Sequence, residues 1–342
     1  MTVMELHQER TTATHARSTM KAIVHERYGP PDVLELRDVD MPTFADDQVL
    51  LRVHASSVNP AEWYGVTGPL FARLFGGGLR NPKSATVGAD VAGRVESVGK
   101  DVTEFQPGDE VFGTAAGSWA EYAAAREVRL ARKPANVSFE EAAAVPIAAL
   151  TALQALRDKG RVRPRQKVLI NGASGGVGTY AVQLAKALGA DVTAVCSTRN
   201  VDVARSLGAD RVVDYTKEDF SQLDVRHDLM IDIAGSQPFK RFRRVLTPKA
   251  TVVLVGAKFP SSGGIGPLSH VIGTRLASLG RSQTVRFFVA KINAEDLGVL
   301  AELLEAGKVR SVIDRSFELS HAADALRYLG EGHARGKVII SM

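Results

Sequence analysis

The chain has 342 residues, of which 45% are hydrophobic and 24% are charged, and its formal net charge is +5. This length is sufficient for two domains with separate cores, and the small excess of scattered basic residues gives little support to nucleic-acid binding. The one cysteine, Cys196, excludes an internal disulfide and a cysteine-rich metal site, and no apolar run has the length of a membrane span or the pattern of a signal peptide.

The first part of the chain shows a β pattern. Residues 1–19 are polar and without periodicity, which predicts a disordered N-terminal tail. From Met20 to about Phe139, short apolar runs alternate with turn signals. This pattern predicts a largely β, barrel-like domain over residues 20–139. Strands are expected at 21–24, 34–36, 48–55, 92–98 and 110–113.

The strongest motif lies between residues 167 and 189. Val168-Leu169-Ile170 is a short apolar run typical of a buried parallel strand, and apolar residues then recur at helical spacing. A glycine-rich turn that opens a helix leaves backbone N–H groups unpaired, and the helix dipole favours negative charge there, so a pyrophosphate fits. The turn residues assigned to this role are Gly172, Ser174, Gly175, Gly176, Val177 and Gly178. An ordinary strand-to-helix turn is the alternative interpretation.

The alternation of strands and helices continues after this motif. Apolar runs at 191–196, 211–214, 228–232 and 250–256 predict a parallel, doubly wound Rossmann sheet, and we place this α/β domain at 140–307. A run at 285–290 is a candidate edge strand, and the weakly patterned segment 261–284 is expected to be a connection. Residues 308–342 are expected to return to the first domain. Four residues end later strands, where open α/β sheets bind ligands: Ala234, Val255, Gly256 and Ala257.

The end of the second nucleotide strand indicates which cofactor binds. Sites that prefer NAD place an acidic residue there, which binds the ribose 2′-hydroxyl and repels a 2′-phosphate. Here the sequence is Ser197-Thr198-Arg199-Asn200, with no acid before Asp202. Two hydroxyls and a guanidinium suit a phosphate, so NADPH is the predicted cofactor. The alternative is that Arg199 is only a solvated residue at a helix start.

Several segments carry a family resemblance, in the family's order from about residue 20 to the C-terminus. They are the glycine turn and residues 58–64, 87–93, 106–111, 146–151 and 334–338. On these segments the chain resembles the zinc-independent branch of the medium-chain dehydrogenase/reductase superfamily, close to quinone oxidoreductases and enoyl reductases. The resemblance implies a GroES-like β-barrel catalytic domain, a Rossmann cofactor domain inserted between its halves, and a cleft that holds the nicotinamide.

The resemblance also bears on metal binding. Zinc-dependent relatives have a cysteine ligand where this chain has Asn59, and a His-Glu pair where it has Ala89-Asp90. Neither replacement supplies a thiolate or an imidazole, so we expect no metal site. Without a metal Lewis acid, reduction of an acceptor that is already electrophilic is more plausible than alcohol oxidation.

The resemblance further implies roles for individual side chains. Tyr64 matches a tyrosine that faces the acceptor, and Asn59 lies in the segment beside the nicotinamide, so both are candidate catalytic residues. Thr151, Tyr215 and Lys337 match cofactor-binding positions. Alternatives remain: Tyr64 packs beside its neighbour with a solvated hydroxyl, Asn59 is a turn residue before proline, and Thr151 bonds its own helix backbone.

Residues and resemblance together predict an NADPH-dependent, zinc-free oxidoreductase. It would transfer a hydride to a small-molecule electrophilic acceptor, either a quinone or an α,β-unsaturated carbonyl compound. Two alternatives remain open, a nucleotide-binding structural or regulatory protein without turnover and a zinc-dependent alcohol dehydrogenase. We expect a cytoplasmic protein without nucleic-acid or membrane partners, and the resemblance implies a homodimer formed through 285–290.

Overall fold

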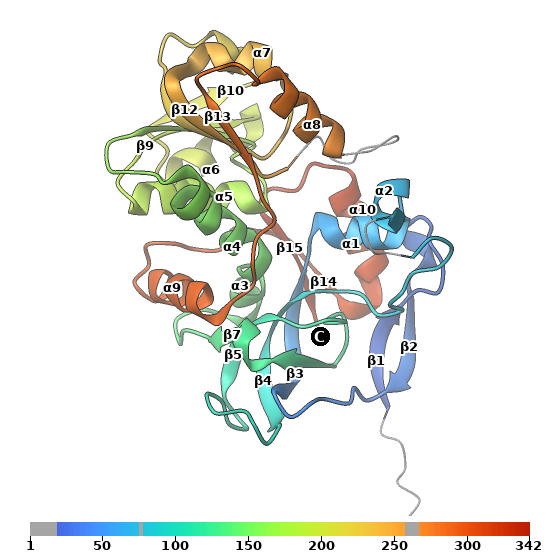
Figure 1. Cartoon of the computed structure of the whole chain (residues 1–342). Coiled ribbons are helices and arrows are strands. Elements are labelled where there is room, and N and C mark those ends of the chain that lie inside the picture. The colour runs from blue at the N-terminus through green and yellow to red at the C-terminus, as the bar shows by residue number, and fades with distance from the viewer. Residues whose placement is uncertain (1–18, 75–77, 257–266) are drawn as a thin grey trace, which may run out of the picture.

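The computed structural model describes residues 19–74, 78–256 and 267–342. Figure 1 shows an α/β domain above a domain built mainly of antiparallel strands, with the C-terminal strands belonging to the lower domain. Of the predicted tail, residues 1–18 lie outside the described residues, and Thr19 already belongs to the first strand. Within the described part of the chain, no helix is both long and apolar enough to cross a membrane.

The lower domain is built on two sheets. Strands β1 and β2 form an antiparallel pair, and seven others form a sheet in the order β14-β15-β3-β4-β5-β7, with β6 added to β3. Alternate residues of β3 and β4, among them Val49, Leu51 and Val91, are fully buried in one core cluster, as period-two strands require. The strands are β1 (Thr19–Val24), β2 (Glu35–Asp40), β3 (Gln48–Val58), β4 (Asp90–Val98), β5 (Glu110–Thr114), β6 (Tyr122–Arg126), β7 (Leu130–Arg132), β14 (Ile313–Glu318) and β15 (Lys337–Ser341).

The upper domain is the predicted doubly wound sheet. Its six strands are all parallel and lie in the order β10-β9-β8-β11-β12-β13. The apolar run Val168, Leu169 and Ile170 is fully buried because helices cover both faces of the sheet. The order reverses between β8 and β11, where such sheets bind ligands at their carboxyl ends. The strands are β8 (Lys167–Asn171), β9 (Asp191–Cys196), β10 (Arg211–Asp214), β11 (His227–Asp232), β12 (Leu246–Leu254) and β13 (Thr284–Phe287).

The helices complete both domains. They are α1 (Pro60–Thr67), α2 (Leu70–Ala72), α3 (Phe139–Ala143), α4 (Pro146–Gln154), α5 (Gly176–Ala187), α6 (Val201–Ser206), α7 (Phe239–Phe242), α8 (Pro267–Ala277), α9 (Ala294–Glu305) and α10 (Ala322–Gly330). A π-helical turn, Ala155–Gly160, continues α4, and short 3-10 turns lie at Pro31–Val33, Glu127–Arg129, Thr198–Asn200, Phe220–Gln222, Arg243–Val245 and Leu319–His321.

The structure contains elements that were not predicted, among them α8, α9, β6, β7 and β14. The prediction of a simple connection at 261–284 was wrong over residues 267–277, because α8 forms there. A glycine, Gly273, and the β-branched Val271 and Ile272 lie inside this helix and weaken its sequence signal. The short strands β6 and β7 were not predicted, because alanine-rich runs such as Tyr122–Arg126 have low intrinsic β preference.

The C-terminal segment joins the two domains. Strand β15 lies between β14 and β3, and Val338 is paired with Val58. Immediately before β15, the Gly336 N–H donates a hydrogen bond of 2.9 Å to the Ser174 carbonyl oxygen, next to a parallel bridge between Gly175 and Gly336. The glycine turn of the upper domain is therefore held directly against the lower domain.

Candidate functional site

Two cavities meet at the glycine turn between the domains. The larger, of about 790 Å³, runs along the carboxyl ends of the parallel strands, and the smaller, of about 610 Å³, lies between α1 and the turn. Both are lined by Gly175, Ile233, Gly332 and Ala334. An elongated ligand with two halves therefore has room on either side of Gly175, with its middle at the start of α5.

The turn itself leaves space for such a ligand. A Cβ atom at Gly178 would collide with the Gly172 carbonyl oxygen, so glycine is required there for close packing of helix and strand. A Cβ atom at Gly175 would meet only the Gly172 oxygen at 3.8 Å, so the open space faces the cavities. The first amides of α5 have no acceptor within the helix. These features fit the diphosphate of a dinucleotide.

The larger cavity contains five of the predicted cofactor residues, and the smaller contains eight of the predicted site residues. The first set is Gly172, Ser174, Gly175, Tyr215 and Ala234. The second set is Asn59, Tyr64, Gly175, Gly176, Val177, Val255, Gly256 and Lys337. Five other predicted cofactor residues line neither cavity: Thr151, Gly178, Ser197, Thr198 and Arg199. Thr151 Oγ1 donates a hydrogen bond of 2.6 Å to the Ile147 carbonyl oxygen. Ala257 lies outside the described residues.

Thr198 and Arg199, which follow β9, differ in the hydrogen-bond donors that they can offer a phosphate. Thr198 Oγ1 donates a hydrogen bond of 2.6 Å to Asp214 Oδ2, so this hydroxyl hydrogen is already in use. Hydrogen bonds from Thr198 and then Thr216 lower the pKa of Asp214 to about 2, so its carboxylate is ionised. Arg199 is exposed, and its Nη2 donates to the His333 carbonyl oxygen at 2.8 Å. Sequence reasoning missed Asp214 because it belongs to the next strand.

Asn200 is a second residue whose role sequence reasoning missed. Its side chain is buried and its Nδ2 donates hydrogen bonds to Ser174 Oγ at 3.0 Å and to Ser197 Oγ at 3.1 Å. Asn200 thereby connects the glycine turn to the end of β9. The only available signal was its place directly after the Ser-Thr-Arg run, where an asparagine is ordinarily interpreted as a helix cap.

The smaller cavity is mainly apolar. Its walls include Val177, Val255, Val271 and Phe287, and Tyr64 and Lys337 are the titratable side chains among its lining residues. The Tyr64 ring packs edge-on against Phe71 with centroids 5.0 Å apart. Such a cavity can hold a flat ring system away from water while one end offers polar groups.

A buried polar cluster forms one end of that cavity. Lys337 Nζ donates to Asn59 Oδ1 at 2.6 Å and to Asp90 Oδ2 at 3.2 Å, and Asn59 Nδ2 donates to Asp90 Oδ2 at 2.9 Å. Asp90 Oδ2 also accepts from Ser57 Oγ at 2.5 Å, and its Oδ1 accepts from the Ile147 amide at 2.9 Å. These bonds fix the orientation of the Asn59 amide. Sequence reasoning had named Asn59 and Lys337 as site residues, but it had named their common partner Asp90 only as a residue at a former zinc-ligand position.

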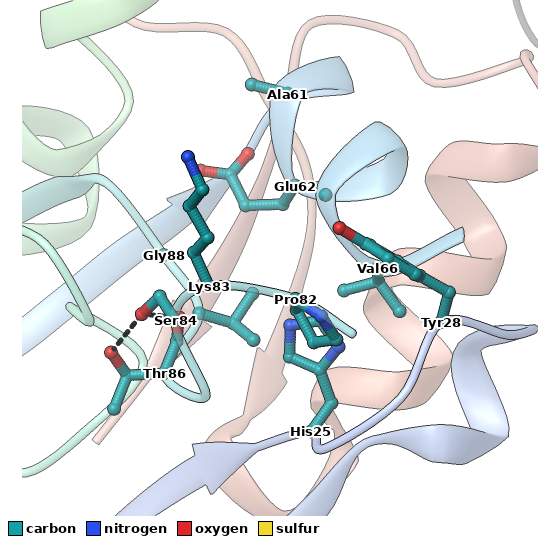
Figure 2. Close-up of a pocket in the computed structure, with 12 residues that line it drawn as sticks. His25, Tyr28, Ala61, Glu62, Val66, Pro82, Lys83, Ser84, Thr86 and Gly88 are labelled. Carbon is teal, nitrogen blue, oxygen red and sulfur yellow. Dashed lines mark hydrogen bonds between the residues drawn. The ribbon is translucent and has the colours of Figure 1, made fainter. Parts of the chain in front are cut away.

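Glu62, in the first turn of α1, supports the backbone of Asn59, the N-cap residue of this helix. Its Oε2 accepts a hydrogen bond of 2.8 Å from the Asn59 backbone N–H. Burial, followed by repulsion from Asp90, raises the pKa of Glu62 to about 7. Glu62 also lines a third cavity of about 310 Å³, and in Figure 2 its side chain and that of Lys83 rise toward the same end of that cavity, away from His25.

A histidine anchors α8 near the cofactor cavities. His270 Nε2 lies 2.8 Å from Oδ2 of the fully buried Asp232, and Asn171 Nδ2 donates to Asp232 Oδ1 at 2.8 Å. The Gly235 amide donates to the same Oδ1 at 3.1 Å. These contacts fix the backbone where β11 ends, and they place Val271 of α8 in the wall of the smaller cavity.

The remaining candidates for chemistry are metal-ligating side chains and the single thiol. Across residues 19–74, 78–256 and 267–342, no group of three or more His, Cys, Asp or Glu side chains is placed to hold a metal ion. Cys196 is buried in β9, and burial raises the pKa of its thiol to about 11. This thiol is therefore unreactive at neutral pH and serves as a small apolar residue.

Comparison with known proteins agrees with this architecture. Residues 45–135 match the family model of the alcohol dehydrogenase GroES-like domain, and residues 207–340 match the family model described as zinc-binding dehydrogenase. The GroES-like and Rossmann-type fold expected from the sequence is thereby confirmed.

Three similar proteins illustrate the relationship. A 2-methylene-furan-3-one reductase of Solanum lycopersicum is 37% identical over 97% of this chain and 81% of its own length. A chloroplastic NADPH-dependent alkenal/one oxidoreductase of Arabidopsis thaliana is 34% identical over 94% of this chain and 79% of its own length. The structure of a quinone oxidoreductase from Coxiella burnetii superposes with a TM-score of 0.82, at 32% identity, over 95% of this chain and 100% of that chain.

Proposed function

The chain belongs to the medium-chain dehydrogenase/reductase superfamily, among its quinone oxidoreductase-like members, and on that premise we propose a zinc-free, NADPH-dependent reductase. It reduces a quinone or an α,β-unsaturated carbonyl compound by hydride transfer. The observation that carries this proposal is the pair of cavities that share Gly175, one with the more polar lining along the strand ends and one mainly apolar beside α1.

The preference for NADPH rests on the end of β9. Relatives of this family use a nicotinamide cofactor, and the Arabidopsis relative is named for NADPH. In this chain Ser197 and Arg199 follow β9 without an acid between them and Asp202. Arg199 is a cation free to exchange a backbone carbonyl for a phosphate.

The side chains then have distinct tasks. The α5 amides hold the diphosphate, while apolar residues such as Val177, Val255 and Phe287 keep water away from the reacting carbons. The bound cofactor supplies the hydride. The Asn59 amide is held in one orientation by Lys337 and Asp90, so it presents a fixed polar surface to the ring beside it. Tyr64 is placed to donate a hydrogen bond or proton to the acceptor atom that gains negative charge.

The proposal that the enzyme is zinc-free rests on the residues that occupy the ligand positions. Asn59 and Asp90 bind the ammonium of Lys337 rather than leaving their oxygens toward an open site. Two oxygen ligands bound to an internal cation are a poor donor set for zinc, which prefers thiolate and imidazole.

NADPH oxidation followed by stopped-flow, against a panel of quinones, enones and simple alcohols, tests the function. We expect turnover with at least one of the first two classes and none with alcohols plus NADP⁺, unchanged after treatment with a chelator. Tight NADPH binding without reduction of any acceptor would support a structural or regulatory role instead, and loss of activity with the chelator would contradict the zinc-free mechanism.

Two further predictions concern assembly and location. We propose a homodimer through β13, which is an edge strand and leaves Phe287 and the following Val289 42% and 79% exposed. Light scattering of the wild type and of Val289→Lys tests it.

The cytoplasmic location also stays a prediction, because the Arabidopsis relative is named as chloroplastic. Cell fractionation decides between the cytoplasm and an organelle.

A further inference from the structure

Asn200 stands where an asparagine ordinarily caps a helix, yet it does not cap. It is the N-cap residue of α6, and its side chain accepts no hydrogen bond from the first turn of that helix. Its side chain is instead turned away from α6, toward the glycine turn and the end of β9. An N-cap hydrogen bond would stabilise α6, so its absence indicates that the Asn200 side chain has another role.

The carbonyl of the same side chain is left without a partner. Asn200 is 4% exposed, and its Oδ1 is one of two buried side-chain oxygens that lack a hydrogen bond in the described structure. Burying a carbonyl without a hydrogen bond costs free energy, because the group loses its hydrogen bonds to water and forms none in the protein. The orientation of the amide is therefore set by its two donor bonds, to Ser174 and Ser197.

Those two bonds determine where the serine hydrogens can point. Each serine oxygen accepts an N–H of Asn200, at 3.0 Å for Ser174 and 3.1 Å for Ser197. Among the described residues, neither hydroxyl donates to another protein group. Because a hydroxyl that accepts from the amide must send its own hydrogen elsewhere, both serines are left as outward donors. Ser174 lines the larger cavity, and Ser197 follows β9 directly.

Thr198 shows the opposite arrangement one residue away. Its hydroxyl hydrogen is directed to the Asp214 carboxylate, so it has only lone pairs to offer a ligand. The two hydroxyls that Asn200 contacts are thus kept as donors, whereas those of Thr198 and Thr216 donate to the Asp214 carboxylate. A phosphate has several acceptor oxygens and no obligatory donor, so it suits the first kind of hydroxyl.

We infer that Asn200 is a positioning residue for cofactor selectivity, which holds the Ser174 and Ser197 hydroxyls as donors toward the adenosine ribose and so favours its 2′-phosphate over a 2′-hydroxyl. This inference rests on the proposed use of NADPH. It assigns the selectivity to an uncharged buried side chain in addition to the exposed cation Arg199. It requires no contact between Asn200 and the cofactor.

The substitution Asn200→Asp reverses the arrangement with almost no change of shape. A carboxylate can only accept, so both serine hydrogens turn inward and lone pairs face the cofactor. We expect the Kd for NADPH to rise about tenfold or more, with the Kd for NADH changed less than about threefold. Titration of nucleotide fluorescence measures both. Equal weakening of the two cofactors, with a lowered melting temperature, would mean a merely structural role and overturn the inference.

A second variant covers the case in which a buried aspartate prevents folding. Asn200→Leu fills the same space and leaves both serine hydroxyls free to rotate. We expect it to weaken the binding of NADPH by about fivefold, with little effect on the binding of NADH. In a background where Ser174 and Ser197 are both alanine, Asn200→Leu should add less than about twofold, because the residue acts through those hydroxyls. A full additional loss in that background contradicts the inference.

The same titrations separate this inference from the proposed function. If the wild-type protein does not bind NADPH, or binds NADH more tightly, the cofactor assignment fails whatever Asn200 does. If the wild type prefers NADPH and Asn200→Asp keeps that preference, the inference fails and the cofactor assignment stands. Arg205→Ala, an exposed change on the same short helix, serves as the matched control and should alter neither Kd.

Discussion

The ammonium of Lys337 lies 3.2 Å from a carboxylate oxygen of Asp90, and both side chains are almost completely buried. Lys337 comes from the last strand of the lower domain and Asp90 from the first residue of β4, so this ion pair connects distant parts of the chain. It also aligns Asn59 at the end of the acceptor cavity. Stability and geometry of the site should therefore depend on the same pair.

Replacing Lys337 by methionine should destabilise the protein strongly. The change leaves the Asp90 carboxylate buried without its cation, which costs about 3 kcal/mol or more of unfolding free energy. Urea unfolding measures it. Lys21→Met is the matched control, because Lys21 pairs with Asp38 at 2.8 Å on the surface and should cost less than about 1 kcal/mol. Similar losses for the two variants would show that the Asp90 pair is not important for stability.

Glu62 should make stability depend on pH. Its pKa is raised from an ordinary value of 4.5 to about 7, so the folded state holds a proton that the unfolded state releases. The contribution is fully present below about pH 4.5 and is lost as the pH rises through about 7, by about 3 kcal/mol at most. Glu62→Gln keeps a side-chain acceptor for the Asn59 backbone N–H. This variant should remove the fall in unfolding free energy between pH 5 and about 7.5.

The control for Glu62 is another carboxylate in the same helical position. Glu141 accepts from the Ser138 backbone at 2.9 Å near the start of α3, but it is only partly buried. Glu141→Gln should leave the pH dependence of unfolding as in the wild type. A wild-type stability curve that is flat from pH 5 to about 7.5, or one that Glu62→Gln does not alter, counts against the raised pKa.

Arg199→Ala should weaken NADPH selectively. The loss of one charge-assisted contact to the 2′-phosphate corresponds to roughly 1.5 to 3 kcal/mol of binding free energy, and NADH binding should change little. Calorimetric titration of both cofactors measures the difference, and its size should shrink with added salt. If NADH weakens equally, Arg199 acts only by holding the His333 carbonyl, and the phosphate assignment is lost.

Tyr64→Phe tests the proposed donor. Phenylalanine keeps the edge contact with Phe71, so the cavity wall is preserved while the hydroxyl is removed. We expect kcat to fall about tenfold to a hundredfold, with the KM for NADPH unchanged. Tyr28→Phe, on a tyrosine whose hydroxyl donates to the Gly78 carbonyl oxygen, is the control and should retain activity. An unchanged kcat for Tyr64→Phe would favour the packing interpretation.

Gly178→Ala should damage the glycine turn. The added Cβ would collide with the Gly172 backbone oxygen, which cannot move without distorting the cofactor turn, so we expect about 2 kcal/mol of lost stability and weak cofactor binding. Gly298→Ala is the control, because nothing lies within 4 Å of its Cβ in the middle of α9. That variant should be as stable as the wild type or more so, by up to about 1 kcal/mol. Thermal unfolding distinguishes the two.

The sequence predicted those parts of the site that local patterns encode. The apolar run Val168-Leu169-Ile170, the glycine turn and the spacing to the next strands determine the Rossmann order, because each is a contiguous signal. The cluster around Asp90 was not predicted as a unit, since Asp90 and Lys337 are 247 positions apart. Asp214 and Asn200 were missed for a related reason: their partners belong to other strands, and a local interpretation makes them a strand end and a helix cap.

Strand β15 also has a consequence for biosynthesis. It is an inner strand of the lower sheet, between β14 and β3, although it follows all the other described strands in the sequence. The upper domain has all six of its strands once β13 has left the ribosome, so it can fold while the lower sheet still lacks an inner strand. During that interval the β3 backbone groups from Ala55 to Val58 that pair with β15 have no hydrogen-bond partner. A nascent chain stalled before Lys337 would expose this strand edge to chaperones and proteases.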